Sequence, residues 1–462
     1  MNTTTAHTDI AATCFASEAD NPIPLELLET SEIESYRSSL TETELAWLDR
    51  QGFTAKSGQF AWLESDGAAR VVCGWDGNDN LSTLGALPMT LPEGTYALAS
   101  AVSDLQLIGW GLGGYQFLRY QDAKRAPAQL LLPVSADSDF VINTTLAVSL
   151  CRDLINTPAQ DMAPSHLAAE VQGLADTFGA TCDITEGDAL LDIKCGAIHA
   201  VGRAAADAPR LIDLQWGEAD HPKITLVGKG VTFDSGGLDI KPSSAMRLMK
   251  KDMGGAATAI GLAYLIMAQK LPVRLRLLVP AAENAISGNA FRPGDVLDTH
   301  KGLKVEIDNT DAEGRLLLCD ALSIGCDEEP ALIADFSTLT GSARSAVGAE
   351  IAAMFCNDDD LAASVAGASV VTDDPVWRMP LHGEYNYMID SKVADVVNSA
   401  PSPYAGAVTA ALFLQRFVST DAWLHFDLMA FNIRNRPGRP EGGEAMALRA
   451  VYDHLATTYG SP

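Results

Sequence analysis

Cysteine pairs of the kind that bind zinc are absent from this sequence. Its 8 cysteines are scattered over 462 residues and no two are separated by two residues, so neither a zinc knuckle nor a thioredoxin-type redox pair is predicted. A long chain with few, dispersed thiols is typical of a reducing compartment. The first Lys or Arg is Arg37, so the cationic start of a secretory signal peptide is missing. We therefore expect a cytoplasmic protein.

Positive charge and long apolar runs are also scarce. The chain has 32 Lys and Arg against 60 Asp and Glu, a formal net charge of −28. An acidic surface repels phosphate backbones and anionic lipid headgroups, so neither nucleic acid nor a membrane is an expected partner. The longest uncharged runs, residues 254–269 and 398–415, are too short or too rich in Gly and Pro to span a bilayer. They are better interpreted as buried helices.

Hydrophobic residues make up 47% of the chain, which supplies a globular core and excludes a disordered chain. A chain of this length is expected to form two large domains or three small ones. We expect a flexible N-terminus over residues 1–20 and a small N-terminal α/β domain over 21–143. A linking helical segment is expected over 144–180, followed by a larger C-terminal α/β domain over 181–462.

Apolar periodicity predicts the elements of both domains. Helices are expected at residues 25–36, 42–51, 140–156, 164–178, 256–269 and 312–325. Strands are expected at residues 60–64, 69–75, 95–99, 197–201, 210–215, 223–233, 273–280, 302–307 and 331–338. The alternation in the second half predicts a mostly parallel central sheet flanked by helices. The Gly-rich run 109–114 has its third glycine too early for a dinucleotide-binding turn and is interpreted as an ordinary turn.

Carboxylates in the second half come just where predicted strands end or helices begin. They are Asp234, Asp252, Asp311 and Glu313, all in loops punctuated by glycine. In an open parallel sheet such loops converge on one crevice, so we expect these four side chains to lie together. Like charges at short range need protons or cations to neutralise them. Two divalent metal ions about 3.5–4 Å apart are the expected solution, because one shared proton cannot offset four carboxylates.

Each motif also has a structural interpretation when it is taken alone. Thr310 and Glu313 have the spacing of a helix capping box, with Asp311 in the first helical turn. Asp252, next to two lysines, fits a solvated ion pair, and Lys229, between two glycines, fits a surface turn. Their joint occurrence at predicted strand ends favours a functional site over these separate alternatives.

The same residues carry a resemblance to a known family. Lys229, Asp234, Lys241, Asp252 and the run 309–316 (NTDAEGRL), at these spacings, resemble the leucyl aminopeptidase (cytosol aminopeptidase) family of dinuclear metalloaminopeptidases. The run is a very specific signature of that family. Further matches are residues 280–284, 287–294 and 338–341. The resemblance is strong from about residue 152 to residue 417 and weak in the amino-terminal part.

The resemblance implies a ligand set for two metal ions. Asp234 and Glu313 would bridge the ions, Lys229 and Asp252 would complete the tighter site, and Asp311 would complete the more exchangeable one. A lysine binds a metal only as the neutral amine, so the ions must lower the pKa of Lys229 far below its ordinary value of about 10.4. Oxygen and amine ligands suit Mn²⁺, Zn²⁺ or Co²⁺ better than calcium. The sequence has no HExxH motif, which separates it from zinc proteases built on that motif.

The resemblance also implies a reaction, the release of N-terminal amino acids from peptides by attack of metal-activated water on the first peptide carbonyl. Lys241 would stabilise the gem-diolate, and Arg315 would hold a bicarbonate ion that acts as general base. The structural alternatives are a plain surface lysine and a helical ion pair between Arg315 and Asp311. Residues 181–462 would then form a catalytic metallopeptidase domain.

Specificity and assembly are implied in the same way. In the family, the pocket for the first side chain is lined by the positions of Met249, Thr338, Leu339 and Gly341. These positions fit leucine or a similar apolar residue, whereas Met429 is expected to reshape the pocket and Ala245 lies where many relatives carry Asn. The family forms homohexamers, dimers of trimers, so a homohexamer is expected here.

Other classes of function are disfavoured. Some relatives bind DNA as architectural proteins, but a net charge of −28 argues against that role here. An inactive member of the family is disfavoured because every expected ligand is present. Serine hydrolase chemistry is disfavoured because the sequence contains no GxSxG motif.

Overall fold

A computed structural model describes residues 13–65 and 67–460, which form two compact units. The first unit contains the described residues up to Ser149 together with Arg434–Glu441, and the second contains Leu150–Ile433 together with the described residues from Gly442 on. The small N-terminal and larger C-terminal α/β parts predicted from the sequence are thereby confirmed. Within the described residues, no helix is both long and apolar enough to cross a membrane.

The first unit is built on a six-stranded sheet in the order β1-β6-β5-β2-β4-β3. All neighbouring strands are parallel except β3 and β4. The strands are β1 (Phe15–Ala16), β2 (Ile23–Glu29), β3 (Phe60–Ser65), β4 (Ala68–Trp75), β5 (Thr95–Leu98) and β6 (Gln129–Leu131). The helices are η1 (Thr30–Glu32), α2 (Ile33–Ser39), α3 (Glu42–Arg50), α4 (Ser82–Gly85), α5 (Leu87–Thr90) and α6 (Asp104–Gly113). Of the segment expected to be flexible, residues 1–12 lie outside the described residues and Phe15–Ala16 pair with β6.

Two predictions in this unit were wrong. Residues 25–29, predicted as helix, belong to β2 and pair with β4 and β5. Leu25 and Leu28 are both buried, and this spacing of three resembles a helix although it arises from a strand covered on both faces. The run 109–114 lies largely in helix α6 rather than in a turn. A Cβ at Gly109 would lie 2.2 Å from Leu81 O, so the glycine permits close helix packing.

The second unit is built on a nine-stranded sheet in the order β16-β15-β18-β14-β9-β11-β8-β7, with β10 also paired to β11. The pairs β15–β18, β11–β8 and β8–β7 are antiparallel, and the other neighbours are parallel. The strands are β7 (Thr181–Glu186), β8 (Arg210–Trp216), β9 (Lys223–Gly228), β10 (Gly230–Asp234), β11 (Arg274–Asn284), β14 (Leu332–Ser337), β15 (Ala352–Cys356), β16 (Val376–Arg378) and β18 (Trp423–Asp427). The mostly parallel sheet predicted for this part is therefore confirmed.

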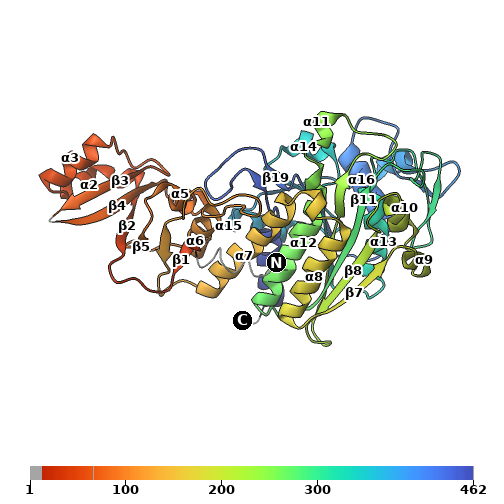
Figure 1. The fold of residues 1–462 in the computed structure, drawn as a ribbon, viewed down its shortest axis with the longest axis horizontal. Coiled ribbons are helices and arrows are strands. Elements are labelled where there is room, and N and C mark those ends of the chain that lie inside the picture. Colours follow the sequence, from red (N-terminus) through yellow and green to blue (C-terminus); the bar gives the residue numbers. More distant parts are fainter. Residues whose placement is uncertain (1–12, 66, 461–462) are drawn as a thin grey trace. The chain divides into compact units, whose positions relative to one another are not determined.

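Helices cover both faces of this sheet. In Figure 1, α8 and α12 lie on one side of it, and α10 and α13 lie on the other. The helices are α7 (Ser138–Asn156), which begins in the first unit, η2 (Ala159–Asp161), α8 (Pro164–Phe178), α9 (Ala189–Asp192), α10 (Gly196–Gly202), α11 (Ser243–Met246), η3 (Met249–Met253), α12 (Gly254–Ala268), α13 (Gly314–Cys326), α14 (Gly341–Val347), α15 (Asp359–Val371), η4 (Gly383–Ile389), α16 (Gly406–Gln415) and α17 (Leu448–Tyr459). Short strands make two small sheets, β12 (Val296–Asp298), β13 (Lys304–Glu306) and β17 (Val396–Val397) in one, and β19 (Phe431–Asn432) and β20 (Gly442–Gly443) in the other.

One short apolar run of the second unit was assigned to the wrong element. Residues 197–201, predicted as a strand, form part of α10. The Asp320 side chain accepts hydrogen bonds from Ala197 N at 3.0 Å and Ile198 N at 3.1 Å, which satisfies two free amides at the start of that helix. A five-residue apolar run does not distinguish a buried strand from a buried helix. The contact with Asp320 depends on the fold, so the sequence alone could not predict it.

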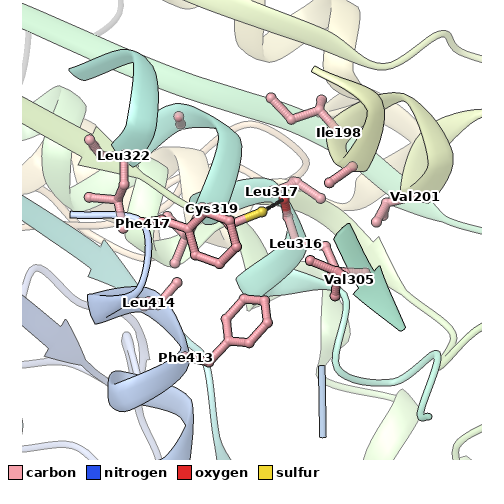
Figure 2. Close-up of a cluster of buried hydrophobic side chains, with 14 of the residues drawn as sticks. Ile198, Val201, Val305, Leu316, Leu317, Cys319, Leu322, Phe413, Leu414 and Phe417 are labelled. Carbon is pink, nitrogen blue, oxygen red and sulfur yellow. Dashed lines mark hydrogen bonds between the residues drawn. The ribbon is translucent and has the colours of Figure 1, made fainter. Parts of the chain in front are cut away.

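Helix α13 is fixed in a large hydrophobic cluster. Figure 2 shows Leu316, Leu317 and Leu322 of α13 among side chains from α10, α16 and the small sheet. Residues 314–326 of α13 are all buried. Tight packing of this kind leaves little freedom of position, so Glu313, which immediately precedes the helix, is held by the core.

Candidate metal centre and active site

The charged residues of the site come from the carboxyl ends of neighbouring strands and from the start of a helix. Lys229 lies between β9 and β10, Asp234 is the last residue of β10, and Asp252 lies in η3. Glu313 immediately precedes α13. In the parallel register of β10 and β11, Asp234 is opposite Asn284, so both side chains end at the same edge of the sheet. This edge is where ligands bind in open α/β sheets.

Lys229 holds one half of the cluster together. Its Nζ lies 2.7 Å from Asp252 Oδ2 and 3.1 Å from Glu313 Oε1. The lysine is 2% exposed. Burial would lower the pKa of Lys229, but the surrounding carboxylates, Asp252 first, outweigh that effect and raise the pKa above its ordinary range. Lys229 therefore pairs with these carboxylates as an ammonium group and must lose its proton to bind a metal.

Lys241 holds the other half. Its Nζ lies 2.7 Å from Asp234 Oδ2 and 2.5 Å from Asp311 Oδ1. Asp234 also accepts hydrogen bonds at its Oδ1, from Asn284 Nδ2 and from Gly236 N, both at 2.9 Å. Burial opposes the charge of Lys241, but Asp234 and Asp311 outweigh it and raise the pKa of the lysine. The two lysines together thus contact all four of the carboxylates predicted from the sequence.

The carboxylates are placed to share a cation. Asp234, Asp252 and Glu313 are buried, and each offers an oxygen within 4.8 Å of the others. Glu313 Oε2 is buried and has no hydrogen-bond partner among the described residues. Burial, and then the charge of Asp234, raise the pKa of Glu313 to about 8. An unpaired buried carboxylate oxygen beside two more carboxylates fits a divalent metal, because a cation would satisfy all three groups.

Arg315 is the second residue of α13, and its hydrogen-bond partner is a backbone carbonyl rather than one of the other charged groups of the site. Its Nη1 donates a hydrogen bond to Asn398 O at 2.7 Å, whereas its buried Nε has no partner among the described residues. Burial lowers the pKa of Arg315 to about 10. The guanidinium group therefore keeps a free donor, which fits a small anion such as bicarbonate.

The residues expected to line the substrate pocket lie on the loop after β14 and in η3. Thr338 Oγ1 donates to Asp252 Oδ1 at 2.7 Å, so this loop touches the metal cluster. Leu339 N and Thr340 N donate to Asp427 Oδ1 at 2.9 and 3.0 Å, which fixes the loop to the end of β18. Gly341 begins α14 and Met249 begins η3.

The structural alternatives for the site residues are wrong. Thr310 Oγ1 donates to Gly236 O, and α13 has no side-chain cap, so no capping box forms. Asp252 is 3% exposed and pairs with Lys229 instead of the adjacent lysines, so it does not form a solvated ion pair. Lys229 is 2% exposed, so it does not lie in a surface turn. Lys241 is not a plain surface lysine, because Asp234 and Asp311 hold it. The helical pair of Arg315 with Asp311 does not form either, since Arg315 binds Asn398 O.

Comparison with known proteins shows the family of this chain. The model of the cytosol aminopeptidase family, catalytic domain, matches residues 149–452. The chain belongs to this family. The model of the M17 aminopeptidase N-terminal domain matches residues 23–133. The protein is accordingly a hydrolase, an exopeptidase of the aminopeptidase type, from a metal-dependent family.

Relatives cover nearly the whole chain. The crystal structure of cytosol aminopeptidase from Coxiella burnetii is 46% identical, with a TM-score of 0.93, and covers 97% of this chain and 100% of its own. The bottromycin maturation enzyme BotP in complex with Mn is 32% identical, with a TM-score of 0.85, over 95% of this chain and 99% of its own. A probable cytosol aminopeptidase of Syntrophotalea carbinolica is 35% identical over 449 residues, 88% of this chain and 90% of the relative.

Sequence reasoning missed two residues that orient the site in this family member. Asn284 is fully buried, and its amide donates to Asp234 Oδ1 and, at 3.1 Å, to Thr310 O. The match of residues 280–284 to the family pattern was the available signal for Asn284. Asp427 gave no such signal, because only the fold brings the end of β18 to the loop after β14. Of the departures from the family pattern, Ala245 lies in α11 and Met429 lies half-buried two residues after β18.

Proposed function

We propose that this protein is a metal-dependent aminopeptidase that uses two divalent cations, Mn²⁺ or Zn²⁺, to release N-terminal amino acids from peptides. The observation that carries the proposal is the buried group of Asp234, Asp252 and Glu313, with its unpaired oxygen on Glu313 and with Lys229 paired to Asp252 and Glu313. Asp234 and Glu313 would bridge the ions, Lys229 and Asp252 would complete one site, and Asp311 the other. The Mn in BotP is that of a relative and supports the choice of metal.

The chain's own residues then have distinct tasks. Divalent cations, when bound, supply Lewis-acid activation of water and of the peptide carbonyl group. Lys241, held by Asp234 and Asp311, donates a hydrogen bond to the developing gem-diolate oxygen and stabilises its charge. Arg315 holds a bicarbonate ion that accepts the proton as general base, and its free Nε supports this role.

Leucine and similar apolar residues are the first side chains that we expect the enzyme to release. Met249, Thr338, Leu339 and Gly341 would line the pocket for that side chain. The link from Thr338 to Asp252 supports this arrangement, because it joins the pocket directly to the metal cluster. The proposal requires a substrate with a free N-terminal amine, because that amine is the group by which the enzyme recognises the first residue of the peptide.

We also propose the surroundings in which the enzyme acts. It is a cytoplasmic homohexamer, a dimer of trimers, that takes peptides as substrates and binds neither membranes nor nucleic acid. Light scattering coupled to size exclusion tests the assembly, and a fully active monomer would contradict it. A mobility shift with DNA at low salt and micromolar protein would contradict the exclusion of nucleic acid.

The test of the reaction is hydrolysis of leucine p-nitroanilide by protein stripped with a chelator and then given Mn²⁺ or Zn²⁺. Activity should be lost on stripping, return with the metal, and be confined to the free amine when N-acetyl-leucine p-nitroanilide is the control. Activity that survives complete metal removal, or equal cleavage of the acetylated substrate, would overturn the proposal. Glu313→Ala should abolish activity while the protein stays folded.

A further inference from the structure

Two cationic side chains beside the expected substrate pocket have no partner for their buried nitrogens. Lys251 lies in η3, two residues after Met249, and is 1% exposed. Among the described residues, neither Lys251 Nζ nor the buried Nη1 of Arg344 in α14 has a hydrogen-bond partner. Buried cationic groups are normally paired because their desolvation is costly. This arrangement therefore suits an anionic group that comes from outside the chain.

The nearby carboxylates are already engaged elsewhere. Asp252 is bound by Lys229 and Thr338. Asp427 accepts hydrogen bonds from the backbone of the loop after β14 and from Thr340 Oγ1 at 2.5 Å. Both carboxylates influence Lys251 through their charge, but neither forms a hydrogen bond with its Nζ. The amine is thus left for a different acceptor.

The two cations are close to each other and to the pocket. The positive charge of Arg344 acts on Lys251, so the two side chains lie near each other. Arg344 Nη2 lies 3.9 Å from the position that a Cβ of Gly341 would occupy. Apart from the residues adjacent to Gly341 and the backbone of its own helix, no other described atom comes within 4 Å of that position. The guanidinium group therefore borders open space at Gly341, one of the residues expected to line the pocket.

We propose that Lys251 and Arg344 form a carboxylate-binding position in the pocket for the first side chain, so that the enzyme releases N-terminal Glu and Asp as well as apolar residues. This inference rests on the proposed aminopeptidase function and names a further class of substrate for the same site. The side-chain carboxylate of the substrate accepts hydrogen bonds from Lys251 Nζ and Arg344 Nη1, and its methylene groups take the place of an apolar side chain.

The experiment compares three p-nitroanilides, those of Glu, Gln and Leu, on the full chain loaded with Mn²⁺. Glutamine has the size of glutamate without its charge, so the ratio of kcat/KM for Glu over Gln reports the anionic interaction alone. Charged hydrogen bonds predict a ratio of about 10 or more. The ratio should fall to about 1 in Lys251→Met and in Arg344→Met. Lys250→Met is the matched control, because Lys250 Nζ is already bound to Asn156 O at 2.6 Å, and its ratio should stay that of the wild type.

The outcomes separate this inference from the proposed function. Cleavage of Leu and Gln substrates with Glu no better than Gln would overturn the inference and leave the aminopeptidase intact. An unchanged ratio in both variants would also overturn it. Cleavage of none of the three substrates would remove the proposed function and this inference with it. If Lys251→Met does not fold, the wild-type ratio and Arg344→Met decide the question.

Discussion

The side chain of Lys229 passes directly over the α-carbon of Gly314. A Cβ at position 314 would lie 2.3 Å from Lys229 Cε and 2.7 Å from Nζ, and these are distances that real Cβ atoms do not adopt. Glu313, whose carboxylate pairs with Lys229, immediately precedes this glycine. The absence of a side chain at the first residue of α13 is thus a condition for the lysine to reach Asp252.

Gly314→Ala should displace Lys229 and disrupt the metal centre. The buried lysine is held by Asp252 and Glu313, so it cannot move aside without losing those contacts. We expect Mn²⁺ affinity and kcat/KM each to fall by about 10-fold or more, as for other changes that misplace a metal ligand. Isothermal titration and p-nitroanilide hydrolysis measure the two quantities.

The matched control for this variant is Gly367→Ala in α15. No atom lies within 4 Å of a Cβ at Gly367, and alanine is the better helix former, so we expect a gain of about 0.5–1 kcal/mol in stability. A Gly314→Ala enzyme with the metal affinity of the wild type would show that Lys229 has room to move.

Thr338→Val should weaken the metal centre without altering its ligands. Valine has nearly the shape of threonine but removes the donor that binds Asp252 Oδ1 at 2.7 Å. Loss of such a supporting hydrogen bond typically costs about 10-fold in metal affinity or more. Thr338→Ser keeps the hydroxyl group and should restore most of the affinity. Equal Mn²⁺ affinity for the Val and Ser variants would contradict the prediction.

The stability of metal-free protein should fall as pH rises from about 5 to about 8.5. Burial, and then the charge of Asp234, raise the pKa of Glu313 to about 8 and that of Asp311 to about 6. Unfolded carboxyl groups titrate near 4, so the folded state holds protons that the unfolded state releases. The stability from those protons is complete below about pH 4 and is lost as pH rises through about 6 and 8.

Melting temperatures with and without Mn²⁺ across that interval test this dependence. The increase in Tm caused by Mn²⁺ should grow with pH, because the cation competes with the same protons. Glu313→Gln should flatten the metal-free profile in part. Burial also raises the pKa of Asp320 to about 7. Asp320 therefore also lowers the stability as pH rises, both in the wild type and in Glu313→Gln. A metal-free Tm that rises over this interval would contradict the assignment.

Arg152→Met should destabilise the catalytic unit strongly. Arg152 is fully buried, and its Nη2 lies 3.0 Å from Glu444 Oε2 and 3.2 Å from Oε1. Removing one partner leaves a buried charge uncompensated, which typically costs about 3–5 kcal/mol. Urea unfolding measures the loss. The double variant Arg152→Met/Glu444→Gln should recover a large part of it, and a double variant as unstable as the single one would argue against the ion pair.

Much of the element pattern could be predicted because it depends on local chemistry. Residues 164–178, for example, were predicted as a helix and form α8 with the same bounds. The predictions failed where local pattern and tertiary environment disagreed. Leu25 and Leu28 have helical spacing in a strand that is buried on both faces, and Ala197 and Ile198 belong to a helix whose start is satisfied by distant Asp320.

By itself the sequence indicated the family and the charged residues that the structure brings together. The spacing of Lys229, Asp234, Asp252 and the run 309–316 is specific, and local periodicity places the carboxylates among them where predicted strands end or helices begin. These features follow from residue type and from separation along one stretch of chain.

The tertiary structure decided which groups meet and which are left without partners. Lys229 and Gly314 are 85 positions apart in the numbering, and only the packing of α13 against the sheet brings them into contact. The unpaired nitrogens of Lys251 and Arg344 likewise depend on where η3 and α14 lie in space. Burial and the direction of a side chain are sums over many distant contacts, and no local pattern in the sequence records them.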